Sequence, residues 1–280
     1  MTIKLPIAIT RRSLLVTIAA AALGLSSLFP AATAAQTAAT QPTTPKPTIV
    51  LVHGAWADAS SWNRVTKRLQ RQGYSVMALA NPLRGMTSDS AYIASILATI
   101  PGPIVLVAHS YGGAVITNAA TGNPNVKALV YVAAFIPDKG EVAADLLRFP
   151  GSLLVLPPNP NATLTARPFP GGVDFYVDTE PFRKIFAADL RTEKTALMAA
   201  GQRPLALAAF TDASGPPAWK TIPSWALVAT QDNTIGTANT RFMARRAAPS
   251  RTVEIDASHA VLLSHPDAVV DLIHKAIRGI

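Results

Sequence analysis

One ten-residue stretch constrains the fold of this chain more than any other part of it. Residues 104–113 read Ile-Val-Leu-Val-Ala-His-Ser-Tyr-Gly-Gly, so an apolar run leads into Ser110, with Ala108 two positions before it and Gly112 two positions after it. A buried strand that ends in small-x-Ser-x-Gly and passes directly into a helix makes a sharp turn that holds the serine hydroxyl beyond the strand. Serine alone is a weak nucleophile, so this pattern predicts a base and an anion-binding site elsewhere in the chain.

The composition excludes several kinds of site. None of the 280 residues is a cysteine, which excludes disulfides, thiolate nucleophiles and cysteine-based metal sites. The formal net charge is +9, but the basic residues are scattered and form no stripe interleaved with aromatics, so nucleic-acid binding is not expected. The sequence also lacks a phosphate-binding loop, a dinucleotide fingerprint and a metal-ligand cluster, and we therefore expect neither a cofactor nor a metal.

The N-terminal 34 residues have the pattern of a signal peptide. A basic start is followed by an apolar run over residues 14–29 and by Ala-Thr-Ala at residues 32–34, which fits a cleavage site. The pair Arg11-Arg12 favours a twin-arginine export signal, while an ordinary secretory signal or a retained N-terminal anchor are the alternatives. Residues 35–47 are rich in Ala, Thr, Gln and Pro and are expected to form a disordered linker. The mature protein is thus predicted to be periplasmic or secreted, without stable membrane insertion.

Residues 48–280 are expected to form the folded domain. Apolar runs alternate with helical patterns from residue 48 to residue 135, and the alternation resumes at about residue 225. Such alternation predicts an α/β fold with a mostly parallel sheet of about six strands flanked by helices. The expected strands cover residues 48–52, 74–79, 104–109, 126–135, 225–230 and 252–256. The expected helices cover residues 60–73, 90–100, 111–121, 238–248 and 266–277.

The alternation fails between about residues 137 and 221. This segment holds much of the proline and glycine of the chain. We expect it to be an insertion that covers the carboxyl edge of the sheet. Its short helix candidates cover residues 141–148, 180–190, 193–200 and 205–210.

Four polar segments follow expected strands and are therefore candidates for a shared site. They are His53-Gly54-Ala55, Ser110, Asp232 and His259. Ligands of parallel α/β sheets bind beyond the carboxyl ends of the strands, so these residues are predicted to converge. In that arrangement His259 can take and return the proton of Ser110, and Asp232 can orient the imidazole.

An anion-binding site is predicted from the backbone beside Ser110. The N–H groups of Ala55 and Tyr111 are positioned by these strand ends to donate to a negatively charged oxygen that develops during attack. Ser110 also has a simpler interpretation as an ordinary helix N-cap. That interpretation leaves Gly112 and Gly113 unexplained.

These motifs resemble those of the α/β-hydrolase superfamily, especially small bacterial esterase-like members related to plant methylesterases and hydroxynitrile lyases. The matching segments are His-Gly-Ala-Trp at residues 53–56, residues 107–113, Asp232 and Ser-His-Ala at residues 258–260. The resemblance covers residues 48–280 and implies cofactor-free chemistry and a helical cap over about 137–221. It places the nucleophile on Ser110, the acid on Asp232, the base on His259 and the oxyanion donors on Ala55 and Tyr111. Ala108 departs from the usual glycine of the family, but alanine is still small enough for the turn.

The other histidines are given structural roles. His265 competes with His259 as the base, but its sequence context is that of a helix start, which favours His259. His109 adjoins the nucleophile and is expected to point away from the site. His53 is expected to brace the loop that carries Ala55.

The acid and the pocket are less tightly constrained. Asp138 follows the fourth expected strand and is an alternative acid, whereas Asp256 is expected to lie within or beside its strand. Asp232 can also be explained as a plain turn residue. Three aromatic residues, namely Trp56, Trp219 and Phe135, are about equally consistent with a pocket lining and with the core.

Together these features predict an exported serine esterase that cleaves small-molecule carboxylic esters through an acyl-enzyme on Ser110, and lactone hydrolysis belongs to the same prediction. The alternative is a lyase, like the hydroxynitrile lyases, in which His259 acts as a base and no acyl-enzyme forms. A non-catalytic ligand-binding homologue is a third interpretation. The sequence does not define the natural substrate or the oligomeric state.

Overall fold

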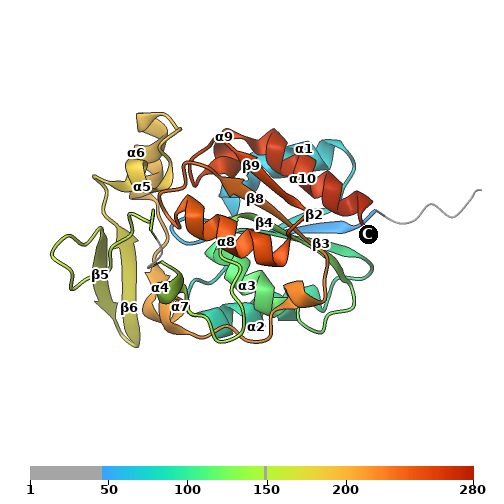
Figure 1. Ribbon diagram of the computed structural model, residues 1–280, viewed down its shortest axis with the longest axis horizontal. Helices are drawn as coiled ribbons and strands as arrows, with labels where there is room; N and C mark the ends of the chain where they lie inside the picture. The colour runs from blue at the N-terminus through green and yellow to red at the C-terminus, as the bar shows by residue number, and fades with distance from the viewer. Residues whose placement is uncertain (1–45, 148–149) are drawn as a thin grey trace, which may run out of the picture. The chain divides into compact units, whose positions relative to one another are not determined.

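The computed structural model describes residues 46–147 and 150–280, and within them a parallel sheet forms the centre of the fold (Figure 1). Its six strands lie in the order β2-β1-β3-β4-β8-β9, and every neighbouring pair is parallel. The strands are β1 (Thr48–Val52), β2 (Val76–Leu79), β3 (Ile104–Ser110), β4 (Val126–Ala134), β8 (Ser224–Ala229) and β9 (Thr252–Ile255). The predicted α/β class with a sheet of about six strands is confirmed. The predicted signal peptide and nearly all of the predicted linker lie outside the described residues.

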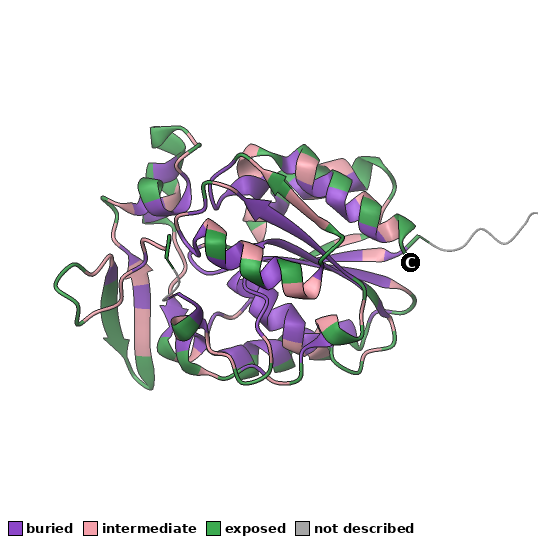
Figure 2. Cartoon of the chain, in the orientation of Figure 1, coloured by how far each residue is buried: buried purple, intermediate pink, exposed green. Residues whose placement is uncertain are grey.

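The four inner strands, β1, β3, β4 and β8, are buried on both faces of the sheet. Successive residues of each strand point to opposite faces, and helices cover both faces. In β1, Ile49 and Leu51 join one apolar core, whereas Val50 and Val52 join the other. The first core is closed by α1 (Asn63–Arg71), α9 (Val261–Ser264) and α10 (Pro266–Arg278), and the second by α2 (Met86–Leu97), α3 (Tyr111–Ala119) and α8 (Thr237–Ala247). Figure 2 shows the buried strands at the centre and the exposed residues on the outer faces of the helices.

Two of the helices that flank the sheet differ from the predicted boundaries by more than two residues. The helix expected over residues 60–73 consists of a 3-10 turn, η1 (Ala59–Trp62), followed by α1. The helix expected over 90–100 is α2, which begins four residues earlier, at Met86. Its first turn contains Asp89, whose carboxylate accepts hydrogen bonds from the backbone N–H groups of Arg84 and Gly85. This capping interaction stabilises the earlier start.

The segment between β4 and β8, residues 137–221, is called the cap segment below. It contains α4 (Ala143–Leu146), β5 (Leu164–Phe169), β6 (Gly172–Val177), α5 (Phe182–Phe186), α6 (Thr192–Ala200), β7 (Leu205–Ala206), α7 (Leu207–Thr211) and η2 (Ala218–Lys220). The sequence predicted only helices here, but β5, β6 and β7 form an antiparallel sheet (Figure 1). Phe169 pairs with Gly172, so Pro170 and Gly171 make a tight hairpin turn, and the φ of 100° at Gly171 suits a glycine.

The cap segment shares the apolar core of the sheet face that α2 and α3 cover. Buried aromatic residues of the cap segment, among them Phe175, Phe182 and Phe210, belong to the same cluster as Val50 and Leu106. The cap segment is thus packed on the strand layer through side chains. Across residues 46–147 and 150–280, no helix combines the length and apolar character needed to cross a membrane.

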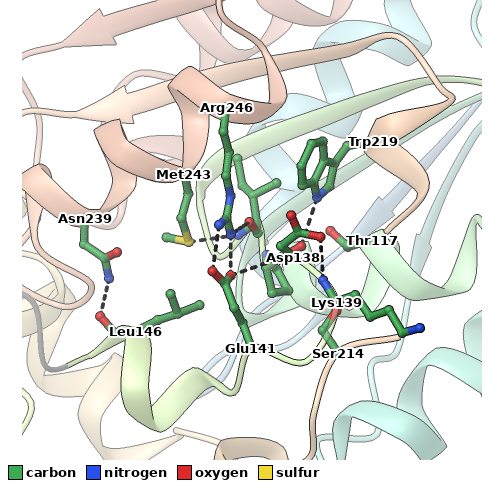
Figure 3. A network of polar contacts seen from close by, with 12 residues as sticks. Thr117, Asp138, Lys139, Glu141, Leu146, Ser214, Trp219, Asn239, Met243 and Arg246 are labelled. Atoms are coloured by element: carbon green, nitrogen blue, oxygen red, sulfur yellow. Dashed lines mark hydrogen bonds and ion pairs between the residues drawn. The ribbon is translucent and has the colours of Figure 1, made fainter. Parts of the chain in front are cut away.

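Both ends of the cap segment are fixed by a polar network, called the attachment network here (Figure 3). Arg246 of α8 makes a bidentate ion pair with Glu141 and also donates to the carbonyl of Ile136 at 2.7 Å. Glu141 in turn accepts the backbone N–H of Asp138 at 2.8 Å. Asp138 pairs with Lys220 at 2.6 Å, which joins the first residues of the cap segment to its last ones.

Replacing Glu141 with glutamine is expected to lower the free energy of unfolding by about 1–2 kcal/mol at pH 7, because a charged, half-buried hydrogen-bond partner of Arg246 is lost. Partial burial alone would raise the pKa of Glu141, but the hydrogen bonds from Arg246 and Asp138 outweigh it and lower this pKa overall. The stabilisation is therefore fully present at a pH above the pKa that Glu141 has in the unfolded chain. It is lost as the pH falls through the lower pKa that Glu141 has in the folded protein.

Urea unfolding at pH 7 and at about pH 3 measures this effect, and the difference between wild type and variant should shrink at the lower pH. The matched control is Glu254→Gln. Glu254 makes a similar bidentate pair with Arg241, but both side chains are more exposed, so a change below about 0.5 kcal/mol is expected. Equal losses for the two variants would contradict the role given to the attachment network.

Candidate active site

Ser110 occupies the sharp turn between β3 and α3. Its φ of 55° and ψ of −130° are unusual for a residue with a side chain and mark local strain. The turn needs small neighbours: a Cβ added to Gly54 would lie 2.5 Å from Cβ of Ser110, and one added to Gly113 would lie 2.3 Å from the carbonyl oxygen of Phe135. A Cβ at Gly112 would likewise come within 2.7 Å of the Val52 carbonyl. These contacts explain the glycines around the serine.

The side chains of Ser110, His259 and Asp232 form one continuous hydrogen-bonded array. Nε2 of His259 lies 2.8 Å from Oγ of Ser110, and Nδ1 lies 2.8 Å from Oδ2 of Asp232. All three residues are buried. A carboxylate only accepts hydrogen bonds, so Nδ1 carries a proton, and in the neutral imidazole Nε2 is then free to accept the proton of the Ser110 hydroxyl. The array can therefore make a serine nucleophilic.

Asp232 is oriented by the turn that follows β8. Its Oδ1 accepts the backbone N–H groups of Thr234 and Ile235 at 2.8 and 3.0 Å. Oδ2 is thereby left for His259, which lies in the loop between β9 and α9. One carboxylate oxygen of Asp232 is thus held by the backbone of the turn, and the other accepts the hydrogen bond from the imidazole of His259.

The loop after β1 places Ala55 beside Ser110, in the lining of the same cavity. Within the described part of the chain, the N–H of Ala55 makes no hydrogen bond, so it is available to a ligand. The next residue, Trp56, has a φ of 56°, which is rare for a bulky side chain. Its backbone N–H donates to Arg203 and its indole N–H donates to Phe175, each at 3.0 Å. The cap segment therefore holds this strained loop in place.

His53 braces the same loop, as the sequence predicted. Its Nδ1–H donates to the carbonyl of Gly54 at 2.8 Å, and its Nε2 accepts the N–H of Asn81 at 2.9 Å. Burial lowers the pKa of His53 to about 4. A neutral imidazole with both nitrogens bonded suits a structural role.

Tyr111 carries the second expected oxyanion donor, since its backbone N–H lies in the first turn of α3, where helix geometry leaves donors without partners. Its side chain is fixed by Asp89, which accepts the phenol O–H at 2.8 Å. Burial raises the pKa of Asp89, although this carboxylate also accepts backbone N–H groups. Sequence reasoning missed Asp89, because only the packing of α2 on α3 brings it to Tyr111.

The cavity above Ser110 is small and mostly apolar. It measures about 10 Å³, room for about one water molecule, so a substrate can enter only if the lining moves. Hollows of 610 and 700 Å³ exist on other parts of the described chain, but none of the array residues lines them. The residues that line the small cavity are Ala55, Trp56, Ser110, Tyr111, Phe135, Ala143, Leu147, Leu154, Leu205, Phe210 and Thr234.

The competing candidates lie elsewhere. His265 is exposed and bonds to Ser264, directly before α10. Asp138 pairs with Lys220 in the attachment network. Asp256 is exposed and accepts a hydrogen bond from Gln231 at 2.6 Å.

The aromatic candidates separate into two groups. Trp56 and Phe135 line the cavity, so they belong to the site as well as to the core. Trp219 lies at the end of the cap segment, where its indole N–H donates to the carbonyl of Pro137 at 2.9 Å. It is part of the cap attachment and not of the cavity lining.

The expectation that His109 points away from the site is wrong. Its ring lies against that of His259, with centroids 4.6 Å apart, and its Nε2–H donates to the His259 carbonyl at 2.9 Å. Complete burial, together with the neighbouring His259, lowers the pKa of His109 well below its usual value. A neutral His109 therefore supports the backbone of His259 from the strand side.

Comparisons with curated proteins find two partial matches. The chain is 32% identical over 111 residues to the carbendazim hydrolyzing esterase of Nocardioides sp. (strain SG-4G), which covers 35% of this chain and 46% of that protein. It is 35% identical over 104 residues to methylesterase 7 of Arabidopsis thaliana, which covers 32% of this chain and 40% of that protein. The matched part thus spans less than half the length of either relative.

Solved structures match over most of the chain. A methylesterase from Arabidopsis superposes with a TM-score of 0.68 at 19% identity, covering 84% of this chain and all of that one. A pyrethroid hydrolase from Sphingobium faniae JZ-2 gives a TM-score of 0.64 at 22% identity, with coverages of 83% and 97%. At these identities the likeness shows the fold.

The family model described as the alpha/beta hydrolase family matches residues 49–272. This chain therefore belongs to the alpha/beta hydrolase family.

Proposed function

We propose that this protein is a serine hydrolase of carboxylic esters that works through an acyl-enzyme on Ser110. The observation that carries the proposal is the array of Ser110, His259 and Asp232, with both hydrogen bonds at 2.8 Å. The names of its relatives, an esterase and a methylesterase, support the same class of reaction.

In this mechanism the Ser110 oxygen attacks the ester carbonyl while its proton moves to Nε2 of His259. The negative charge on the carbonyl oxygen is stabilised by the N–H groups of Ala55 and Tyr111, each typically worth about 10²–10³ in rate. His259 then protonates the departing alkoxide. His259 then deprotonates a water molecule, which attacks the acyl-enzyme. As the bond between the acyl group and the Ser110 oxygen breaks, His259 gives this proton to the Ser110 oxygen, and the acid is released.

The lining of the cavity suits substrates with apolar groups. Its walls are mostly aliphatic and aromatic, and the volume in this conformation is only about 10 Å³. Esters with short or medium acyl chains, or small aromatic esters, are the proposed substrates, and the lining has to move to admit them. Lactones contain the same reacting carbonyl and belong to the same proposal.

A lyase on the same array is the second candidate. Such a reaction needs a charged or strongly polar group in the pocket to stabilise a leaving anion. Among the described residues that line the cavity, no side chain is charged. Its polar groups are the hydroxyls of Ser110, Tyr111 and Thr234 and the indole N–H of Trp56, which is already bonded to Phe175. This lining favours ester hydrolysis. A non-catalytic receptor is disfavoured because the array already has the geometry that activates a nucleophile.

A panel of chromogenic esters, lactones and cyanohydrins, assayed together with mass spectrometry of the intact protein, tests this proposal. Ester turnover with an acyl adduct on Ser110 is the expected result. Cyanohydrin cleavage without an adduct would favour the lyase. The absence of turnover and of labelling by a fluorophosphonate would overturn both reactions.

Export is also proposed, from the signal pattern of residues 1–34. The expected mature chain begins close to residue 35. Its N-terminal sequence, determined from the fraction outside the inner membrane, tests this, and a full-length chain retained in the cytoplasm would contradict it.

A further inference from the structure

A carboxylate of the cap segment contacts the loop that carries His259. Asp189 lies between α5 and α6, and its Oδ2 accepts the backbone N–H of Ser258 at 3.0 Å. Its Oδ1 accepts the hydroxyl of Ser258 at 2.5 Å. The two oxygens thus bind both polar groups of the residue that immediately precedes the base.

The hydroxyl of Ser258 extends this contact across His259. Its oxygen accepts the backbone N–H of Ala260 at 3.2 Å, so Ser258 is bonded to Asp189 on one side and to the residue after His259 on the other. Residues 256–260 form no helix or strand. Because this loop lacks the backbone hydrogen bonds of regular structure, the bonds of Ser258 fix its conformation.

The opposite side of the loop is held by the sheet. His109 donates to the carbonyl of His259, and the N–H of Gln231 donates to the carbonyl of Ala257 at 3.0 Å. The loop is therefore bonded to β3 and the end of β8 from one side and to the cap segment from the other. Of these supports, Asp189 is the one that the cap segment supplies.

Asp189 is an exposed residue, but its carboxylate binds Ser258 as an anion. Partial burial alone would raise the pKa of Asp189, but hydrogen bonds from Ser258 and Ser264 outweigh it and lower this pKa overall. The carboxylate is therefore ionised at neutral pH, and hydrogen bonds to an ionised acceptor are about twice as strong as neutral ones.

We propose that Asp189 is a positioning residue for the reaction: by binding Ser258 it holds the imidazole of His259 at the distance from Ser110 that proton transfer requires. This inference rests on the proposed hydrolase function. It couples the base to the cap segment, which also supplies Ala143, Leu147, Leu154, Leu205 and Phe210 to the cavity wall. If the cap segment moves to admit substrate, the contact of Asp189 with Ser258 moves with it. The chemical step therefore requires that the cap segment first return to the position seen here.

Replacing Asp189 with alanine tests the proposal. A misplacement of about 1 Å can cost about 10²-fold, so kcat is expected to fall by about 10- to 100-fold while KM stays within about threefold. The rate of fluorophosphonate labelling of Ser110 should fall by a similar factor, because that reaction uses the same base. Asp189→Asn keeps one acceptor oxygen and should lose less.

Asp178→Ala is the matched control. Asp178 is also a carboxylate of the cap segment and accepts the hydroxyl of Thr165 at 2.5 Å, but this bond lies within the cap segment. Its loss should leave kcat close to wild type. A loss of kcat in Asp178→Ala equal to that in Asp189→Ala would attribute the effect to general damage of the cap segment and overturn the proposal.

Amide hydrogen exchange of peptides that cover residues 256–264 gives a readout that does not depend on turnover. Faster exchange is expected in Asp189→Ala and not in Asp178→Ala. Unchanged exchange, or a kcat within about twofold of wild type, would overturn the proposal. If the wild type neither turns over esters nor labels at Ser110, the hydrolase function itself fails, and exchange alone then decides whether Asp189 holds the loop.

Discussion

Replacing Ser110 with alanine is expected to lower kcat for ester hydrolysis by about 10⁶-fold. The acyl-enzyme requires the Ser110 oxygen, and among the described residues Ser110 is the hydrogen-bond partner of Nε2 of His259. The oxyanion donors of Ala55 and Tyr111 remain in this variant. The variant is therefore expected to keep a rate about 10³–10⁴ times that of the uncatalysed reaction in water, because substrate binding and the two donors are retained.

Steady-state assays with a chromogenic ester measure this loss, and thermal unfolding shows whether the variant is folded. The matched control is Ser90→Ala. Ser90 is also a buried serine, but its hydroxyl donates to the carbonyl of Val115, away from the array. Its activity should remain close to wild type. Ester cleavage by Ser110→Ala at the wild-type rate would reject the acyl-enzyme mechanism.

The central sheet could be predicted because its signals are local. In β1 and β3 every residue from Ile49 to Val52 and from Ile104 to Ser110 is buried, and such continuous apolar runs are typical of parallel strands covered on both faces. The hairpin of β5 and β6 lacked that signal. In β5 the residues from Thr165 to Phe169 are exposed, so this strand has no apolar alternation. In β6 the alternation of Val173, Phe175 and Val177 is present but short, and it lies in a segment whose prolines and glycines suggest irregular structure.

The core of the site was predictable for a related reason. Ser110, Asp232 and His259 each follow a strand, and the carboxyl ends of parallel strands meet at one edge. The contact of His109 with His259 could not be predicted. Strand alternation only says that residue 109 faces away from residue 110, and not that the loop of His259 passes over that face.

The contacts of Asp89 and Asp189 could not be predicted from the sequence for a different reason. Each acts through a partner that is distant in the chain, Tyr111 for the first and Ser258 for the second. Neither aspartate has a distinctive local pattern. Their roles follow from how α2 and the cap segment pack, which depends on the whole tertiary structure.

Replacing Asp232 with asparagine is expected to lower kcat by about 10⁴-fold, because the variant enforces the wrong tautomer of His259. The backbone N–H groups of Thr234 and Ile235 both point at Oδ1, so the amide oxygen must occupy that position. The amide NH₂ then faces Nδ1 of His259, which has to accept a hydrogen bond. Nε2 consequently carries the proton and cannot take one from Ser110.

The matched control for this variant is Asp138→Asn, which changes the other aspartate that the sequence allowed as the acid. Asp138 pairs with Lys220 in the attachment network, so its variant should keep kcat near wild type and lose only a little stability. Values of kcat at saturating ester, measured for both variants, decide between the two residues. A large loss in Asp138→Asn with little change in Asp232→Asn would reverse the assignment, because only the residue bonded to Nδ1 controls where the imidazole proton resides.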